Sequence, residues 1–215
     1  CFLINAGSFL ASIAALALMR PDELAPHPRS PRQRGQLRAG LSYVRANPAL
    51  YVPLLMMAAV GTLAYEFNVS RPLFARYTFA GNAGTYGAMT ALMGAGAVVG
   101  GLLTAAAGPR APTSLARMAL LFGGLQVATA FAPTLGLALV AMVLLGAASI
   151  AFLALGNATL QLSSTPEMRG RVMALWAMAF LGSTPVGGPI IGWVGQHVNP
   201  RAALAVGGVA TVLSG

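Results

Sequence analysis

The feature that most constrains this chain is a series of long apolar runs separated by short polar loops. A helix that crosses a bilayer needs about 20 mostly apolar residues. The runs meet or approach that length at residues 2–19, 49–69, 85–107, 113–132, 135–162, 172–195 and 202–215. They are too long and too continuous for the alternating strands of about ten residues in outer-membrane barrels. The runs therefore predict an all-α protein that crosses a membrane several times.

Composition excludes the main alternative classes for this chain of 215 residues. Hydrophobic residues make up 57% of it and charged residues only 8%, whereas soluble domains contain about 25% charged residues. The net charge of +9 comes from arginines placed between the apolar runs, where membrane proteins carry the charges that set their orientation. We therefore expect a lipid bilayer as the surrounding medium, and no nucleic-acid partner. A single cysteine also excludes an intrachain disulfide framework.

A polar, basic stretch separates the first run from the others. Residues 20–48 hold six of the thirteen arginines, and prolines interrupt their first half. In the second half, residues 32–46, the apolar side chains of Leu37, Leu41 and Val44 share one face, which predicts an amphipathic helix along the membrane surface. We expect three parts: the last helix of an N-terminal half, a cytoplasmic linker and a C-terminal bundle, with both terminal helices truncated. Their bounds are residues 1–19, 20–48 and 49–215.

Loop charge predicts the orientation of the chain. The linker, the turn at 108–112 and the loop at 163–171 lie on one side and, with adjacent positions, carry ten of the thirteen arginines. Positively charged loops stay in the cytoplasm. The linker and the 163–171 loop are therefore predicted to be cytoplasmic, and residues 71–84 to face outside.

The order of these elements, and several local segments, resemble a known family of transporters. One helix, a long basic linker and six further helices resemble the middle and second half of a major facilitator superfamily transporter. The segments INAGSFLASIAALAL (4–18), LRAGLSYVRANPAL (37–50), RPLFARYTFAGNAGTYG (71–87) and PEMRGRVMAL (166–175) resemble the enterobactin-exporter-like branch of bacterial exporters. This resemblance implies a bacterial inner-membrane protein. Its substrate site lies near the midplane between two halves, so the missing N-terminal half of the chain is an expected partner.

Small residues recur at helical spacing in two of the runs. The segment GSTPVGGPIIG (182–192) resembles the Gly-Pro-rich motif of exporters, whereas the superfamily's loop motif has a counterpart without its aspartate at 101–117. Glycines four residues apart let two helix backbones approach closely, and prolines inside a helix bend it. We expect these residues to form packing faces, with a rocking hinge as the alternative. They are Gly96, Gly100, Pro185, Gly188, Pro189 and Gly192.

Glu66 is the only acidic residue inside any apolar run. A carboxylate in hydrocarbon costs about 2–3 kcal/mol or more, so it is expected to face the helix bundle and to have a function. We predict that it gains and loses a proton during transport. Arg71 is its nearest cation in the sequence, but a spacing of five residues rotates it by about 140°, so a pair requires a break near Pro72. The alternative is a static buried carboxyl group.

Other polar residues are candidates for a substrate path. Asn157 and Gln161 share a face of the predicted helix 135–162 with Ser149, and Gln126 lies in the preceding run. Such side chains line a cavity or bond to a neighbouring helix, and both readings remain open.

The loop at 163–171 carries charges close to a predicted membrane surface. Glu167, Arg169 and Arg171 are candidates for a gate that opens and closes the inner side. The alternative is that they only set the orientation of the chain.

The sequence lacks the patterns of enzymes. Both histidines fall in loops, and there is no phosphate-binding loop, metal-ligand spacing or nucleophile elbow. We expect no catalytic residue, cofactor or metal, and energy from an ion gradient.

The predicted function is secondary active export of a small hydrophobic or amphipathic compound, of drug or siderophore type. It would proceed by alternating access and be coupled to protons. The alternative is a membrane sensor or assembly factor that has the transporter fold without transport activity.

Overall fold

The computed structural model describes residues 2–19, 35–108 and 113–215. The chain divides into two units, residues 1–33 and 34–215. In the first unit, α1 (Phe2–Ala17) is an apolar helix whose serines bond back to carbonyl groups of the same helix. Most of the basic linker, residues 20–34, and four residues of the predicted turn near 110 lie outside the described residues.

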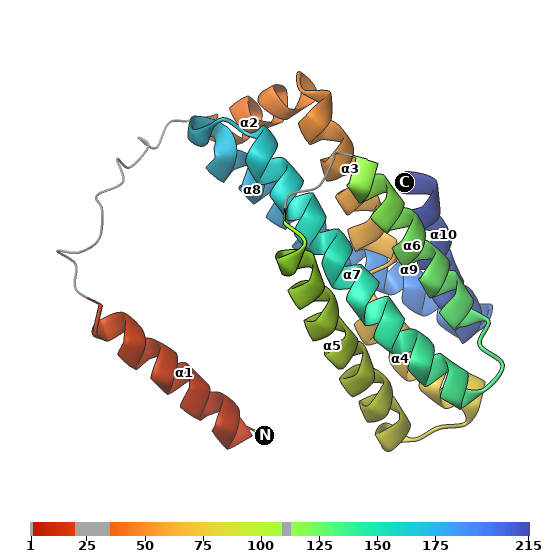
Figure 1. The fold of residues 1–215 in the computed structure, drawn as a ribbon. Helices are drawn as coiled ribbons and strands as arrows, with labels where there is room; N and C mark the ends of the chain where they lie inside the picture. Colours follow the sequence, from red (N-terminus) through yellow and green to blue (C-terminus); the bar gives the residue numbers. More distant parts are fainter. Residues whose placement is uncertain (1, 20–34, 109–112) are drawn as a thin grey trace. The chain divides into compact units, whose positions relative to one another are not determined.

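The second unit is a bundle of helices, with no strand among its described residues (Figure 1). The elements are α2 (Gln36–Arg45), α3 (Pro48–Leu63), α4 (Phe67–Leu73), the π-helix η2 (Phe74–Thr78), α5 (Ala83–Ala106), α6 (Thr113–Ala130), α7 (Leu135–Ser163), α8 (Pro166–Leu181), α9 (Thr184–His197) and α10 (Pro200–Ser214). Figure 1 shows α5 beside α7 and α2 at one end of the bundle. The end of the linker thus packs with the bundle.

Within the described residues, four helical segments are long and apolar enough to cross a membrane. They are Pro48–Thr78, Ala83–Ala106, Leu135–Ser163 and Pro166–His197. Shorter apolar helices cover Asn5–Ala17, Ser114–Ala130 and Pro200–Ser214. The helical, membrane-spanning character predicted from the apolar runs is therefore confirmed.

The first of these segments differs from the single helix expected at 49–69. It extends to Thr78 and is interrupted at residues 64–66, between α3 and α4. Pro72, where a break was considered, lies inside α4. The chain passes from α4 directly into the wider turns of η2, and such turns accommodate irregular hydrogen bonding within a helix.

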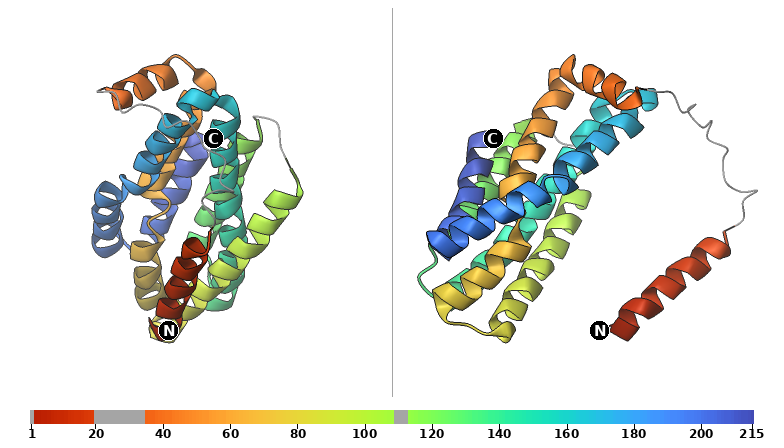
Figure 2. Two further views of the ribbon diagram at one scale, coloured as in Figure 1. Left: turned by 90° about the vertical axis from the view of Figure 1, so that its left-hand side faces the viewer. Right: turned by 180° about the vertical axis from the view of Figure 1, so that it is seen from behind.

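The segment expected as one helix at 172–195 is also composite. α8 ends before Gly182, and α9 begins after Ser183. Pro185 lies in the first turn of α9, where its missing N–H group costs nothing, and Pro189 lies inside the helix. The interruption therefore precedes both prolines. Figure 2, right, shows α8 and α9 (blue) following one another, seen from behind relative to Figure 1.

α5 and α7 approach each other through glycines. A Cβ atom on Gly96 would lie 1.9 Å from the Val143 carbonyl oxygen, and one on Gly100 would lie 2.3 Å from that of Ala147. Both distances are too short for any side chain, so glycine is required at both positions. This pair of helices flanks the core of the bundle, in which Phe122 and Phe152 are almost fully buried.

Candidate functional site

The interruption between α3 and α4 is a local change in backbone hydrogen bonding. At the end of α3, the N–H groups of Ala64 and Tyr65 both donate to the carbonyl of Val60, over 2.8 and 3.2 Å. The helical pattern starts again where the N–H of Ser70 donates to the carbonyl of Glu66 over 2.9 Å. Carbonyl groups at the end of a helix have no partner inside it, so other parts of the bundle must supply one.

Three consecutive residues of this break each contact a different helix. The Ala64 carbonyl accepts a hydrogen bond of 3.2 Å from the Gln126 side chain of α6. The Tyr65 hydroxyl donates to the Ser149 carbonyl of α7 over 2.6 Å. The Glu66 side chain lies against α9, next to Gly187. The position of the break is therefore determined by three helices that are distant in sequence.

The Glu66 side chain is buried and lies against the first turn of α9. Only 5% of this residue is exposed. A Cβ atom on Gly187 would lie 3.1 Å from its Oε1 atom, and one on Gly188 would lie 3.6 Å from Oε2. The side chain of Thr184 also approaches the carboxyl group. The α9 residues beside the carboxyl group thus include two glycines and a threonine.

Gly187 makes the closest contact between α9 and the broken helix. A Cβ atom there would lie only 1.8 Å from the Thr62 carbonyl oxygen, so no other residue fits. Gly188 and Gly192, identified from their spacing, face Val69: Cβ atoms added to them would lie 4.0 and 3.5 Å from its methyl carbons. The spacing argument missed Gly187, although the doubled glycine in GSTPVGGPIIG was a signal for it.

Arg71 does not pair with Glu66. Its Nε atom donates to the Phe67 carbonyl over 3.0 Å and its guanidinium donates to Asn68 Oδ1 over 3.3 Å. The guanidinium carbon also lies 5.8 and 5.9 Å from the ring centroids of Phe67 and Tyr86, within the range of a cation–π contact. Arg71 is 8% exposed and belongs to helix α4, whereas the sequence placed it in an outer loop.

Tyr65 is a component of the break that sequence analysis did not identify. Its ring lies 5.0 Å from that of Phe180 and 5.4 Å from that of Phe122, measured between centroids. Such aromatic pairs stabilise a core beyond the area that they bury. The ring therefore joins α6 and α8 to the broken helix, while the hydroxyl reaches α7.

The polar residues proposed for a substrate path separate into two groups. Gln126 is 1% exposed and bonds to Ala64, so it lies in a helix interface and does not line an open cavity. Asn157 and Gln161 hydrogen-bond to each other on the surface of α7. They line an open cavity of about 540 Å³ with apolar neighbours that include Leu153. Glu66 does not line that cavity.

Glu167, Arg169 and Arg171, which were expected in a loop, lie in the first turns of α8, because that helix already begins at Pro166. Arg169 Nε donates to the carbonyl of Gln161, at the end of α7, over 3.1 Å. Arg171 donates to the Met168 sulfur over 3.3 Å. Neither hydrogen bond involves Glu167, which is exposed. The structure thus attaches the start of α8 to α7 through Arg169.

These features define an all-α, multi-pass membrane protein. The family of transmembrane secretion effectors matches residues 1–215, and the chain belongs to this family of major facilitator transporters. No curated protein and no solved structure matches the chain. The family confirms the predicted superfamily and the expectation of a transporter. Assignment to the enterobactin-exporter-like branch remains a prediction.

Proposed function

We propose that this chain forms the second half of a proton-coupled exporter in a bacterial inner membrane. It moves a small hydrophobic or amphipathic compound, of drug or siderophore type, by alternating access. The first half of the same polypeptide supplies the other side of the substrate path. The family assignment supports transport, and the lack of phosphate-binding motifs in the sequence favours an ion gradient as its energy source.

The observation that carries the proposal is the location of Glu66. Its carboxyl group lies at a break in a membrane-spanning helix and against another helix. Ionisable residues inside a membrane protein commonly mark ion pathways and proton relays, and broken helices are the usual location of coupling-ion sites in transporters. Glu66 is the proton-carrying group in this proposal.

Two further groups of residues have roles in the proposal. Asn157 and Gln161 line the substrate path on the open face of α7, because their cavity combines amide groups with apolar walls. Arg169 acts at the inner gate, because its bond to the end of α7 must change if α7 and α8 separate there.

Efflux from proteoliposomes under an imposed pH gradient tests the role of Glu66. The full-length transporter is compared with its Glu66→Gln and Glu66→Asp variants, with rates normalised to folded protein. Gln keeps the size and hydrogen bonding but cannot titrate, so gradient-driven efflux falls to the level seen without a gradient. Asp retains part of the activity at a shifted pH optimum, because its carboxyl group retreats by one methylene.

Two results contradict parts of the proposal. Gradient dependence in Glu66→Gln equal to that of the unchanged protein assigns coupling to a group outside this chain. Efflux at background level from the unchanged, folded protein over a broad compound panel favours the alternative, a sensor or assembly factor. Thr184→Val is a matched control, since it alters the contact with the carboxyl group but leaves the carboxyl group itself in place. Its efflux should still depend on the pH gradient.

A further inference from the structure

Helix α2 has an apolar face that the bundle covers only in part. Val44 is 3% exposed and Gly40 is buried against α8. Leu37 and Leu41 flank these residues on the same face, yet they are 63% and 42% exposed. The apolar face is therefore wider than the protein surface that packs on it, and part of it is left for an apolar partner.

Positive charge surrounds this apolar surface. Arg38 and Arg45 are exposed on α2, and Arg169 and Arg171 lie in the first turns of α8. Glu167 is the only acidic residue in these two segments. The combination of exposed leucines with flanking arginines is typical of helices that bind anionic membrane surfaces.

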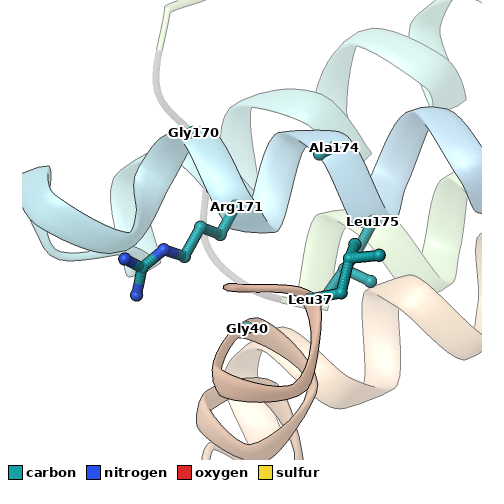
Figure 3. Close-up of a pocket in the computed structure, with 6 residues that line it drawn as sticks. All are labelled: Leu37, Gly40, Gly170, Arg171, Ala174 and Leu175. Carbon is teal, nitrogen blue, oxygen red and sulfur yellow. The ribbon is translucent and has the colours of Figure 1, made fainter. Parts of the chain in front are cut away.

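A cavity of about 230 Å³ lies between α2 and α8. Figure 3 shows the leucine side chains at one end of it and Arg171 extending away from them. Its lining is formed by three residues with little or no side chain, two leucines and one arginine: Gly40, Gly170, Ala174, Leu37, Leu175 and Arg171. The cavity thus offers an apolar wall next to a cation.

Among the described residues, the Arg171 guanidinium uses few of its N–H donors. Its hydrogen bond in the structure goes to the Met168 sulfur, a weak acceptor, whereas a guanidinium has five N–H donors. Guanidinium groups match the geometry of phosphate oxygens.

We propose that the cavity between α2 and α8 binds one anionic phospholipid. The phosphate binds Arg171, and an acyl chain lies along Leu37 and Leu175. Gly40 and Gly170 contribute no side chains to the lining of the cavity. A Cβ atom on Gly170 would meet no atom within 4 Å, so the space above it is open to a ligand.

Native mass spectrometry of the full-length protein tests this site independently of transport. The protein is purified in detergent, incubated with phosphatidylglycerol or phosphatidylcholine, and scored for retained lipid. We expect a preference for phosphatidylglycerol. Arg171→Gln lowers its retention about fivefold, which corresponds to the loss of one arginine near an anionic surface.

Gly170→Leu provides a second variant that does not depend on charge. An added Cβ atom at Gly170 meets no atom within 4 Å, and a leucine in the lining of the cavity should reduce retention of phosphatidylglycerol by a similar factor. Gly94→Leu is the matched control, since an added Cβ atom at that exposed glycine of α5 also meets no atom within 4 Å. It should retain lipid as the unchanged protein does.

Four outcomes would overturn the proposal. The first is equal retention of the two lipids. The second is unchanged retention in both Arg171→Gln and Gly170→Leu, and the third is an equal loss in Gly94→Leu. Glycerol phosphate serves as a soluble competitor without acyl chains. The fourth outcome is displacement of phosphatidylglycerol by glycerol phosphate at a concentration similar to that of the lipid, because it would show that the apolar wall contributes nothing to binding.

Discussion

The side chain of Gln126 donates a hydrogen bond of 3.2 Å to the backbone carbonyl of Ala64, which lies 62 positions earlier in the chain. This carbonyl is one of those that α3 leaves without a partner where it ends. A buried carbonyl without a hydrogen bond is costly. Gln126 therefore stabilises the broken form of the helix over a continuous one.

Replacing Gln126 by Leu should lower the free energy of unfolding by about 1 kcal/mol, since one hydrogen bond between helices is lost and a buried carbonyl is left unpaired. Thermal unfolding in detergent, followed by tryptophan fluorescence, measures the change. Gln196→Leu is the control, because Gln196 is exposed at the end of α9. Equal unfolding midpoints for the two variants would contradict the stabilising role of Gln126.

Adjacent glycines in α9 should respond differently to a single methyl group. Gly187→Ala places Cβ 1.8 Å from the Thr62 carbonyl oxygen, so α9 must shift, at a cost of about 1–3 kcal/mol. Gly188→Ala places its Cβ 3.6 Å from the nearest atom, which is ordinary contact. The yield of monodisperse protein in size-exclusion chromatography should fall for Gly187→Ala only. Similar yields for both would mean that α9 is not held against α3.

Tyr65→Phe should separate the contribution of the hydroxyl from that of the ring. The hydrogen bond to Ser149 is lost, while the ring keeps its contacts with Phe180, so stability falls by about 0.5–1.5 kcal/mol. Tyr65→Ala also removes the ring and should cost about 3–5 kcal/mol. Thermal unfolding again provides the measurement. Tyr77→Phe, at an exposed tyrosine, should change nothing.

The predicted orientation can be tested by cysteine labelling in intact cells. On a background without Cys1, a cysteine at Ala83 should react with an impermeant maleimide, and a cysteine at Glu167 should react only after lysis. Both positions are exposed. Substitution at Ala83 also spares the neighbouring Asn82, whose side chain caps α5. The reverse pattern of labelling would overturn the orientation.

The apolar runs predicted most of the helices but not the interruption at residues 64–66. Neither proline nor glycine occurs there, so local sequence gives no sign of a break. It depends on Gln126, Ser149 and Gly187, which lie far away in the chain. Such tertiary contacts override helix propensity, and a single sequence does not reveal them.

The candidate site was predicted in part for the same reason. Glu66 was recognised because an acid in an apolar run is unusual, and this signal is local. Its expected partner, Arg71, was chosen by proximity in sequence, whereas in the structure Arg71 donates hydrogen bonds to the Phe67 carbonyl and to Asn68 Oδ1. The role of Tyr65 was missed, because an aromatic residue in an apolar run carries no distinguishing pattern.

The break in the span has a mechanical consequence. Because the hydrogen-bond ladder stops at Ala64 and restarts at Glu66, the angle between α3 and α4 can change there, as at a pivot between two levers, without breaking the regular hydrogen bonds of either helix. A group at the pivot barely changes its depth in the bilayer when the levers turn, but the surfaces facing it change. If Glu66 carries the proton, as proposed above, rotation of its surroundings would exchange that proton between the two sides without a large movement of the carboxyl group.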